Sequence, residues 1–187
     1  MTRLSTLVAA TLMAVAAPAL AEGNKAAVVH KNITLAEVEA AQKGWCGALL
    51  QIAGDFESGG REKATATAAA IIDAAYGYAD GAVLFKPTLT MGEQTFRTTR
   101  EGALAYFVGG NPKFPNDAGF ALMGWKNCEI ANSAIFIDGD VAMTQGNVIF
   151  TNTKGEKTTV DKTWGFHKGD DGKVRVVLHH SSLPYGG

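Results

Sequence analysis

The chain has 187 residues and a formal net charge of −1, from 17 basic and 18 acidic residues. No long run of one charge sign occurs, so the sequence gives no electrostatic reason to expect nucleic acid or an anionic membrane surface as a partner. This length and composition indicate one soluble domain whose partner is a small molecule or a second copy of the chain.

The N-terminus has the pattern of a secretory signal peptide. Arg3 precedes a short apolar run, and small residues stand at the −3 and −1 positions relative to the bond between Ala21 and Glu22. The run is too short for a typical membrane span, and no second apolar segment reaches that length. We therefore expect residues 1–21 to be removed, residues 22–187 to form a single domain, and the mature protein to be periplasmic or secreted.

The sequence contains two cysteines, Cys46 and Cys128. In an oxidising compartment they could form one disulfide bond. The alternative is a pair of buried free thiols, and the sequence does not supply the distance between the two Cα atoms that would decide between them.

Two helices are predicted in the first half of the chain. Thr34 and Glu37 have the spacing of a capping box, and apolar residues then recur at helical spacing as far as the glycines of residues 58–60. A second, alanine-rich helix is predicted over residues 61–76, with Gly77 as its stop signal.

Shorter elements follow. A strand is predicted over residues 81–88, and residues 95–97 form a second short extended piece. Thr98 and Glu101 have the spacing of another capping box, which predicts a short helix that ends before Gly109.

The rest of the chain is predicted to form strands. The extended runs cover residues 119–137, with a bend or bulge, and residues 141–151, 157–167 and 173–182. Glycine-containing turns separate them, which is typical of antiparallel neighbours. Helices followed by such a meander indicate the α+β class, with a cone-like curved antiparallel sheet and the N-terminal helices packed on its concave side. This order is similar to the cone-shaped fold named after nuclear transport factor two, which hosts many unrelated functions.

The histidines do not form a recognisable metal site. Because adjacent strand residues point to opposite faces, His179 and His180 cannot share one ion without a bulge. His30 and His167 complete no metal-binding spacing. Ser181 lies two residues from His179, about 6.6 Å along a strand, which is too far for direct activation of a serine nucleophile. The sequence therefore predicts neither a protein-ligated metal nor a serine hydrolase.

Four polar residues remain as candidates for holding a small molecule: Thr88, Tyr106, His179 and Ser181. Each also has an ordinary structural interpretation. A threonine after a proline is commonly a turn residue, a helical tyrosine commonly packs with its hydroxyl exposed, and a strand histidine commonly forms part of a wall.

Several separate segments together resemble the iota-class carbonic anhydrases. In chain order they are Ala74-Ala-Tyr-Gly-Tyr78, Val83-Leu-Phe-Lys-Pro-Thr88, Phe96-Arg-Thr-Thr99, Gly102-Ala-Leu-Ala-Tyr-Phe-Val-Gly109, Gly119-Phe-Ala-Leu122, Trp125, Val160-Asp-Lys-Thr-Trp164 and His179-His-Ser-Ser-Leu-Pro-Tyr185. Trp45 in the first predicted helix fits the same family. Several motifs in the right order are more specific than any one of them.

This resemblance implies reversible hydration of carbon dioxide to bicarbonate and a proton, by an enzyme that is usually a homodimer. It also implies that polar side chains bind bicarbonate without a metal or other cofactor, although claims of metal-dependent members leave room for loosely held zinc or manganese. Carried over residue by residue, the site consists of Thr88, Tyr106, His179 and Ser181. The first two and Ser181 would hold water and nascent bicarbonate, and His179 would accept or relay the proton.

The last strand contains a conflict. Its apolar residues alternate in step with His180 and Ser182, so hydrophobic patterning turns that pair inward, whereas the family match favours His179 and Ser181. A sheet covered on both faces, by helices and by a partner subunit, would remove the conflict.

Two other functions are compatible with the same fold. One is a non-catalytic ligand-binding or oligomeric association module. The other is a cyclase or isomerase, which would need a carboxylate base, and Asp73 and Asp161 are the candidates for that role.

Overall fold

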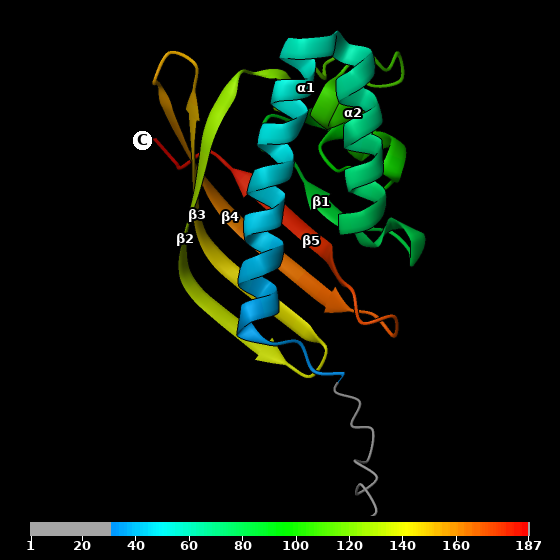
Figure 1. Ribbon diagram of the computed structural model, residues 1–187, viewed down its shortest axis with the longest axis vertical. Helices are drawn as coiled ribbons and strands as arrows, with labels where there is room; N and C mark the ends of the chain where they lie inside the picture. The colour runs from blue at the N-terminus through cyan, green and yellow to red at the C-terminus, as the bar shows by residue number, and fades with distance from the viewer. Residues whose placement is uncertain (1–30, 187) are drawn as a thin grey trace, which may run out of the picture.

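The computed structural model describes residues 31–186, so the predicted signal peptide and its cleavage site lie outside the described residues. The regular elements, labelled in Figure 1, are α1 (Leu35–Ala75), β1 (Leu84–Lys86), α2 (Arg100–Val108), β2 (Trp125–Asp138), β3 (Val141–Asn152), β4 (Lys157–Lys168) and β5 (Val174–Ser182). Short 3₁₀ helices cover Gly77–Ala79, Gly92–Gln94 and Phe120–Leu122. Within the described part of the chain, no helix has both the length and the apolarity needed to cross a bilayer.

The α1 helix consists of two arms. It begins at the capping box between Thr34 and Glu37, as predicted, and both reciprocal hydrogen bonds are present. Gly60 interrupts it with φ 71° and ψ −169°, a conformation that favours glycine. The chain reverses there, so that residues 35–59 and 61–75 run side by side (Figure 1). The prediction of two helices separated by the glycine pair is therefore confirmed.

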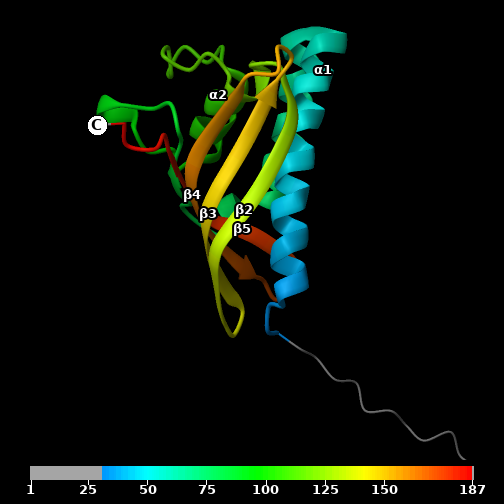
Figure 2. The same ribbon diagram turned by 90° about the vertical axis from the view of Figure 1, so that its left-hand side faces the viewer.

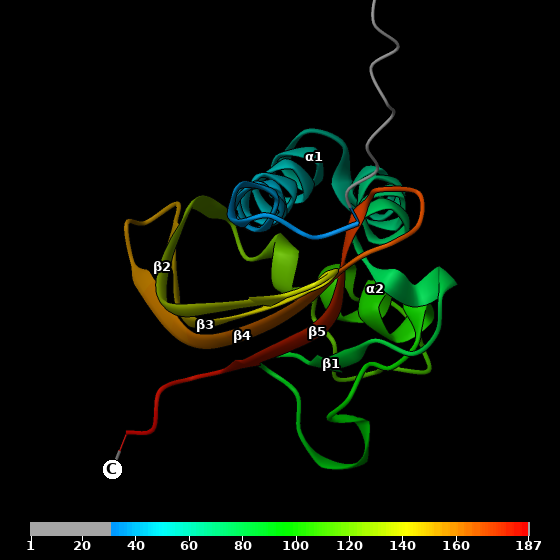
Figure 3. The same cartoon turned by 90° about the horizontal axis from the view of Figure 1, so that it is seen from below.

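One five-stranded sheet forms the other layer, in the order β1-β5-β4-β3-β2. Its neighbours are antiparallel except β1 and β5, which pair in parallel. The sheet curves, and the helices lie on its concave side (Figures 2 and 3). The predicted α+β class and cone-like arrangement are confirmed. Buried aromatic side chains fill the space between the layers, and the largest of them are Tyr76, Phe85, Phe150, Trp164 and Phe166.

Several predicted boundaries are wrong. The strand predicted over residues 81–88 covers only Leu84–Lys86. The short helix is capped by Thr99 rather than Thr98, and the Thr99 side chain accepts a hydrogen bond from the amide of Gly102. Glu101 is then one position too early to complete a capping box, because the third helical residue is Gly102. The strand predicted from residue 119 begins only at Trp125, since a 3₁₀ turn occupies residues 120–122.

A β-bulge in β5 resolves the conflict over which side chains face inward. Gly165 pairs with Leu178 but Phe166 pairs with Val176, so Val177 is an extra residue with no partner on β4. The extra residue shifts the alternation by one position. Val176 and His179 are consequently on the same buried face, with exposures of 3% and 2%. The structure therefore turns His179, and two residues later Ser181, towards the helices.

A disulfide bond between Cys46 and Cys128 connects the first arm of α1 to β2. The two Cα atoms are 5.5 Å apart, within the usual range for a disulfide. The bond joins residues separated by 82 positions, so it holds the helical layer against the edge of the sheet. Cys46 adjoins Trp45, which belongs to the site described below.

The bulge predicts a measurable effect of a methyl group at Gly165. A Cβ atom there would lie 2.9 Å from Cβ of Leu178, which cannot move without shifting β5. We expect Gly165→Ala to lower the free energy of unfolding by about 1–3 kcal/mol, as over-packing does.

Gly47→Ala is the matched control, because Gly47 is helical and its added Cβ would meet no atom within 4 Å. That change should stabilise by up to about 1 kcal/mol. Chemical denaturation measures both, and equal effects would contradict the role of the bulge.

Candidate active site

Three hydroxyl groups from different elements meet on the concave side of the sheet. Thr88 follows β1 and Ser181 lies on the parallel strand β5, and the Thr88 hydroxyl donates a hydrogen bond to Ser181 Oγ at 2.6 Å. Tyr106 comes from α2, and its buried hydroxyl has no hydrogen-bond partner among the described residues. Burial raises the pKa of Tyr106. Polar groups of Leu89 and Thr88 near the Tyr106 oxygen lower that pKa, but they offset the effect of burial only in part. The tyrosine is therefore protonated at neutral pH.

This arrangement leaves two O–H groups available to a ligand. When Thr88 donates to Ser181, the Ser181 proton is free to point elsewhere, and the Tyr106 proton is also unused. Buried polar groups are almost always satisfied, so an unused buried hydroxyl indicates a missing partner such as water or a ligand oxygen. The hydroxyl cluster, Thr88, Tyr106 and Ser181, can thus donate to the oxygens of a small anion.

His179 lies next to this cluster, but its ring nitrogens contact other side chains and not the hydroxyl groups of the cluster. Its Nδ1 is 2.8 Å from the hydroxyl of Tyr76, which also accepts a hydrogen bond from Trp45 Nε1 at 2.9 Å. Its Nε2 is in hydrogen-bonding contact with Nζ of Lys162. Both ring nitrogens are thus engaged inside the protein. The four side chains form a continuous buried chain, which we call the Trp45–Lys162 chain.

Aromatic rings surround His179. The closest is Phe85, whose ring centroid is 4.2 Å from that of the imidazole, followed by Trp45 at 5.5 Å. Burial lowers the pKa of His179 well below its ordinary value, and repulsion from Lys162 and His180 lowers it further. At neutral pH the imidazole is therefore uncharged.

Sequence reasoning missed Lys162, Tyr76 and Trp45 as members of the site. Lys162 is buried and belongs to one of the quoted motifs, but nothing in the motif assigned it a role. A signal was available in the sequence. Lys162 lies two residues from each of the apolar residues Val160 and Trp164, so all three share the inward face of β4. A lysine on an apolar strand face is rarely fully buried unless paired.

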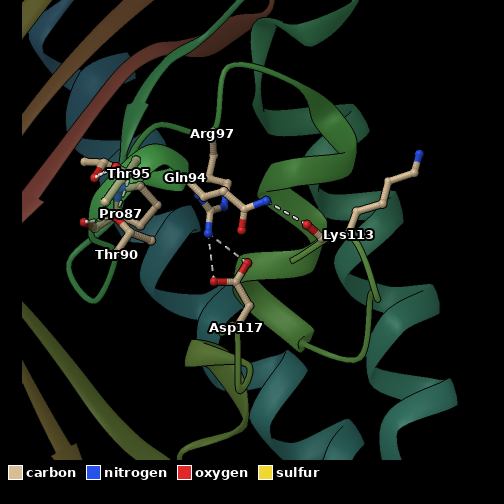
Figure 4. Close-up of polar contacts among 8 residues, drawn as sticks. Pro87, Thr90, Gln94, Thr95, Arg97, Lys113 and Asp117 are labelled. Carbon is tan, nitrogen blue, oxygen red and sulfur yellow. Dashed lines mark hydrogen bonds and ion pairs between the residues drawn. The ribbon is translucent and has the colours of Figure 1, made fainter. Parts of the chain in front are cut away.

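Several contacts hold the loop that carries Thr88. The Thr90 hydroxyl donates to the carbonyl oxygens of Pro87 at 3.2 Å and Thr95 at 2.8 Å (Figure 4). Arg97, which ends this loop, binds both oxygens of Asp117 at 2.8 and 3.1 Å. Both side chains of this ion pair are almost completely buried.

The ion pair between Arg97 and Asp117 also fixes α2. A side chain at Gly102 on α2 would come within 3.0 Å of Arg97 Cδ, so the arginine packs directly against the helix that carries Tyr106. The backbone amide of Arg97 donates to the carbonyl of Phe85 in β1 at 2.8 Å. The pair therefore connects the elements that carry Thr88 and Tyr106.

The alternative site residues lie elsewhere. His180 is exposed and lines a groove on the outer sheet face together with Ser182 and Asp161. Asp73 is exposed and paired with Arg100. Among the residues that the structure describes, no recorded hydrogen bond or ion pair joins either aspartate to the hydroxyl cluster, so neither candidate is placed as the base that a cyclase or isomerase would need. Residues 31–186 also contain no group of three or more histidine, cysteine or carboxylate side chains placed to hold a metal ion.

Comparison with known proteins gives a consistent assignment. Residues 36–183 match the family described as metal-independent carbonic anhydrase. A protein of Nostoc sp. (strain PCC 7120) with this name is 56% identical over 161 residues, which cover 86% of this chain and 78% of the relative. The crystal structure of a cyanobacterial iota-carbonic anhydrase complexed with bicarbonate superposes with a TM-score of 0.86 and 55% identity, covering 87% of this chain and 99% of the other.

The curved sheet, the buried hydroxyl cluster and these matches together define an α+β enzyme of carbon dioxide chemistry. The chain belongs to the metal-independent carbonic anhydrases, the iota class. It catalyses the reversible hydration of carbon dioxide to bicarbonate.

Proposed function

We propose that carbon dioxide and bicarbonate bind at the hydroxyl cluster of Thr88, Tyr106 and Ser181. The observation that carries this proposal is the buried, unpartnered hydroxyl of Tyr106 beside the hydrogen-bonded pair of Thr88 and Ser181. The family relative crystallised with bicarbonate supports an anion of this size and charge. The cluster supplies at least two O–H donors, which suits the carboxylate-like oxygens of bicarbonate.

In the hydration direction, a water molecule held in the cluster attacks the carbon of carbon dioxide. The new C–O bond pushes negative charge onto the two carbon dioxide oxygens, and the O–H groups of Tyr106 and Ser181 stabilise that charge as it develops. The water also loses a proton, which we assign to the neutral His179 and its hydrogen-bonded partners. His179 and Ser181 lie on one face of β5 about 6.6 Å apart, a gap that one water molecule spans.

We expect Tyr106→Phe and Ser181→Ala to reduce kcat/KM for carbon dioxide hydration by about 10²–10³, because each removes one donor to the developing charge. The matched control is Ser182→Ala on the outer face, next along β5, which should retain activity. Stopped-flow hydration assays measure all three variants, and melting temperatures confirm folding. Loss of activity in Ser182→Ala alone would assign the site to the other face of the sheet.

The same assay tests the role of metal. We expect turnover to be unchanged after exhaustive chelation, with metal content measured on the same sample, because hydrogen-bond donors rather than an ion stabilise the charge in this proposal. Activity that disappears and returns with zinc or manganese would contradict it. Complete inactivity before and after chelation would favour a binding or association module instead.

We also propose that the protein is a homodimer that uses the outer face of β1 and β5. Leu84 and Phe96 are 63% and 67% exposed, and both line an apolar groove with Leu178. We expect Phe96→Asp to convert the dimer to a monomer, measured by size-exclusion chromatography with light scattering. Met91→Asp is the control, since Met91 is even more exposed but does not line the groove. A monomeric wild-type protein would refute the proposal.

Finally, we propose that the protein is exported and loses residues 1–21. The disulfide between Cys46 and Cys128 supports this, because such bonds persist mainly in oxidising compartments. We expect protein isolated from its native host to begin at Glu22 and to contain no free thiol. Intact-mass measurement with and without thiol alkylation tests both points, and a retained N-terminus with two alkylated cysteines would contradict export.

A further inference from the structure

Lys162 is a buried lysine that has no acidic partner. It lies on β4 with 4% of its surface exposed, opposite Ser181 in the register between β4 and β5. None of the ion pairs within residues 31–186 includes it. Burying an unpaired ammonium is strongly unfavourable, so a lysine in such a place is either neutral or stabilised by contacts other than an ion pair.

The surroundings of the Lys162 amine are aromatic. Its Nζ lies 4.5 Å from the ring centroid of Trp45 and 5.0 Å from that of Trp164. The one hydrogen-bonding contact recorded for this amine is with Nε2 of His179. The ring faces can accommodate either an amine or an ammonium group, so the protons of the neighbouring residues decide which form is present.

The positions of the protons along the Trp45–Lys162 chain favour the neutral amine form of Lys162. The Tyr76 hydroxyl accepts the N–H of Trp45, and burial raises the pKa of Tyr76, so the phenol keeps its own proton. The remaining contact of that phenol is Nδ1 of His179, which must therefore accept its proton. The proton of the neutral imidazole is then on Nε2 and points at Lys162.

The alternative assignment leaves a buried donor unsatisfied. If Lys162 were an ammonium donating to Nε2, the imidazole proton would be on Nδ1 and would point at Tyr76. The phenol would then accept two hydrogen bonds and leave its own proton without an acceptor among the described residues, which is unfavourable in a buried site. The two assignments differ by one proton on the pair of Lys162 and His179.

We propose that Lys162 is a positioning residue for the carbonic anhydrase reaction, which as a neutral amine accepts the Nε2 proton of His179. In this state Lys162 fixes both the tautomer and the orientation of the imidazole beside Ser181. A proton that reaches the pair adds at Nδ1 of His179 while the Nε2 proton passes to Lys162. Lys162 is then an ammonium that donates to Nε2, so the pair holds one exchangeable proton. Carbon dioxide hydration releases one proton per turnover. The fraction of molecules in which the pair can accept that proton depends on pH.

The neighbouring titratable groups agree with a pair that is deprotonated at neutral pH. Burial lowers the pKa of Lys162 and is the main cause of the lowered pKa of His179. His180, next along β5, repels a charge on His179, and the groups that act on Tyr76 are Tyr78 and Tyr106. None of these groups is a carboxylate that would stabilise the charged form.

The tautomer of His179 can be measured in the unmodified protein. We expect ¹⁵N NMR of histidine-labelled protein at pH 7–8 to show His179 with a protonated Nε2 and an unprotonated Nδ1. Acidification should move the ring proton to Nδ1 or protonate both nitrogens. A protonated Nδ1 and unprotonated Nε2 at neutral pH would overturn the proposal, because Lys162 would then be the donor.

Lys162→Met separates positioning from a structural role, because methionine fills a similar volume without an amine. We expect the variant to melt no lower than the wild-type protein, yet to lose about 10²-fold in kcat and the pH dependence that belongs to the pair. Lys168→Met is the matched control on the same strand, where the lysine binds Glu37 at 2.7 Å. It should keep wild-type turnover and lose some stability.

The pH dependence of stability gives a second test with a defined sign. The folded pKa of Lys162 is lowered from 10.5, so the unfolded chain binds more protons than the folded one and stability rises with pH up to about 10.5. The advantage of Lys162→Met over wild type in the unfolding midpoint should therefore be largest near pH 7 and shrink towards pH 10.5. A variant with wild-type turnover and pH profile, or with a melting temperature far below wild type at every pH, would refute the proposal.

Discussion

The hydroxyl group of Tyr76 joins three parts of the chain that are far apart in sequence. Tyr76 ends the second arm of α1 with an extended backbone and forms an isolated parallel bridge with Val176 on β5. Its hydroxyl accepts from Trp45 on the first arm and contacts His179 beyond the bulge. Without this group, a buried indole N–H and a buried imidazole nitrogen would both lack their partner, each at about 1–3 kcal/mol. The placement of His179 therefore depends on the helical layer and the sheet being in register.

The concave side of the sheet contains two polar groups with different chemistry, separated by one aromatic ring. Phe85 contacts His179 at 4.2 Å and Tyr106 at 5.7 Å between ring centroids. On one side of it the hydroxyl cluster has unused O–H donors, and on the other side the Trp45–Lys162 chain is fully occupied. The apolar surroundings strengthen electrostatic interactions in both groups. In the proposed mechanism, binding of the anion and storage of the proton can thus occur in one interior without competing for the same atoms.

Local sequence signals predicted most of the elements correctly. The capping box at Thr34, the glycine pair near Gly60 and the turns between the strands are local, and each lies close to its predicted place. The failures have non-local causes. Thr98 and Thr99 are both plausible caps, and in the structure Thr99 caps the helix where Gly102 packs closely against Arg97.

The candidate site was predicted only in part, because some of its features also depend on contacts between distant parts of the chain. The resemblance identified Thr88, Tyr106, His179 and Ser181, but alternation along the last strand favoured the wrong face. The bulge that corrects it depends on Leu178 packing against Gly165 on another strand, which no pattern within β5 reveals. The partners of His179 are likewise set by tertiary structure, because Lys162 and Tyr76 reach it from β4 and from the end of α1.

The energetics explain how such a site can replace a metal ion. Zinc lowers the pKa of bound water from about 15.7 to about 7, which corresponds to about 12 kcal/mol. One preorganised donor to a developing oxyanion contributes about 3 kcal/mol, so in the proposed mechanism the O–H groups of Tyr106 and Ser181 together supply about 6 kcal/mol. Holding water and carbon dioxide at reacting distance supplies about 7 kcal/mol more. The two contributions match the metal's effect only if both hydroxyls are rigidly aimed. The buried pair of Arg97 and Asp117 connects the elements that carry Thr88 and Tyr106, so in the proposed mechanism it contributes by fixing the positions of the donors.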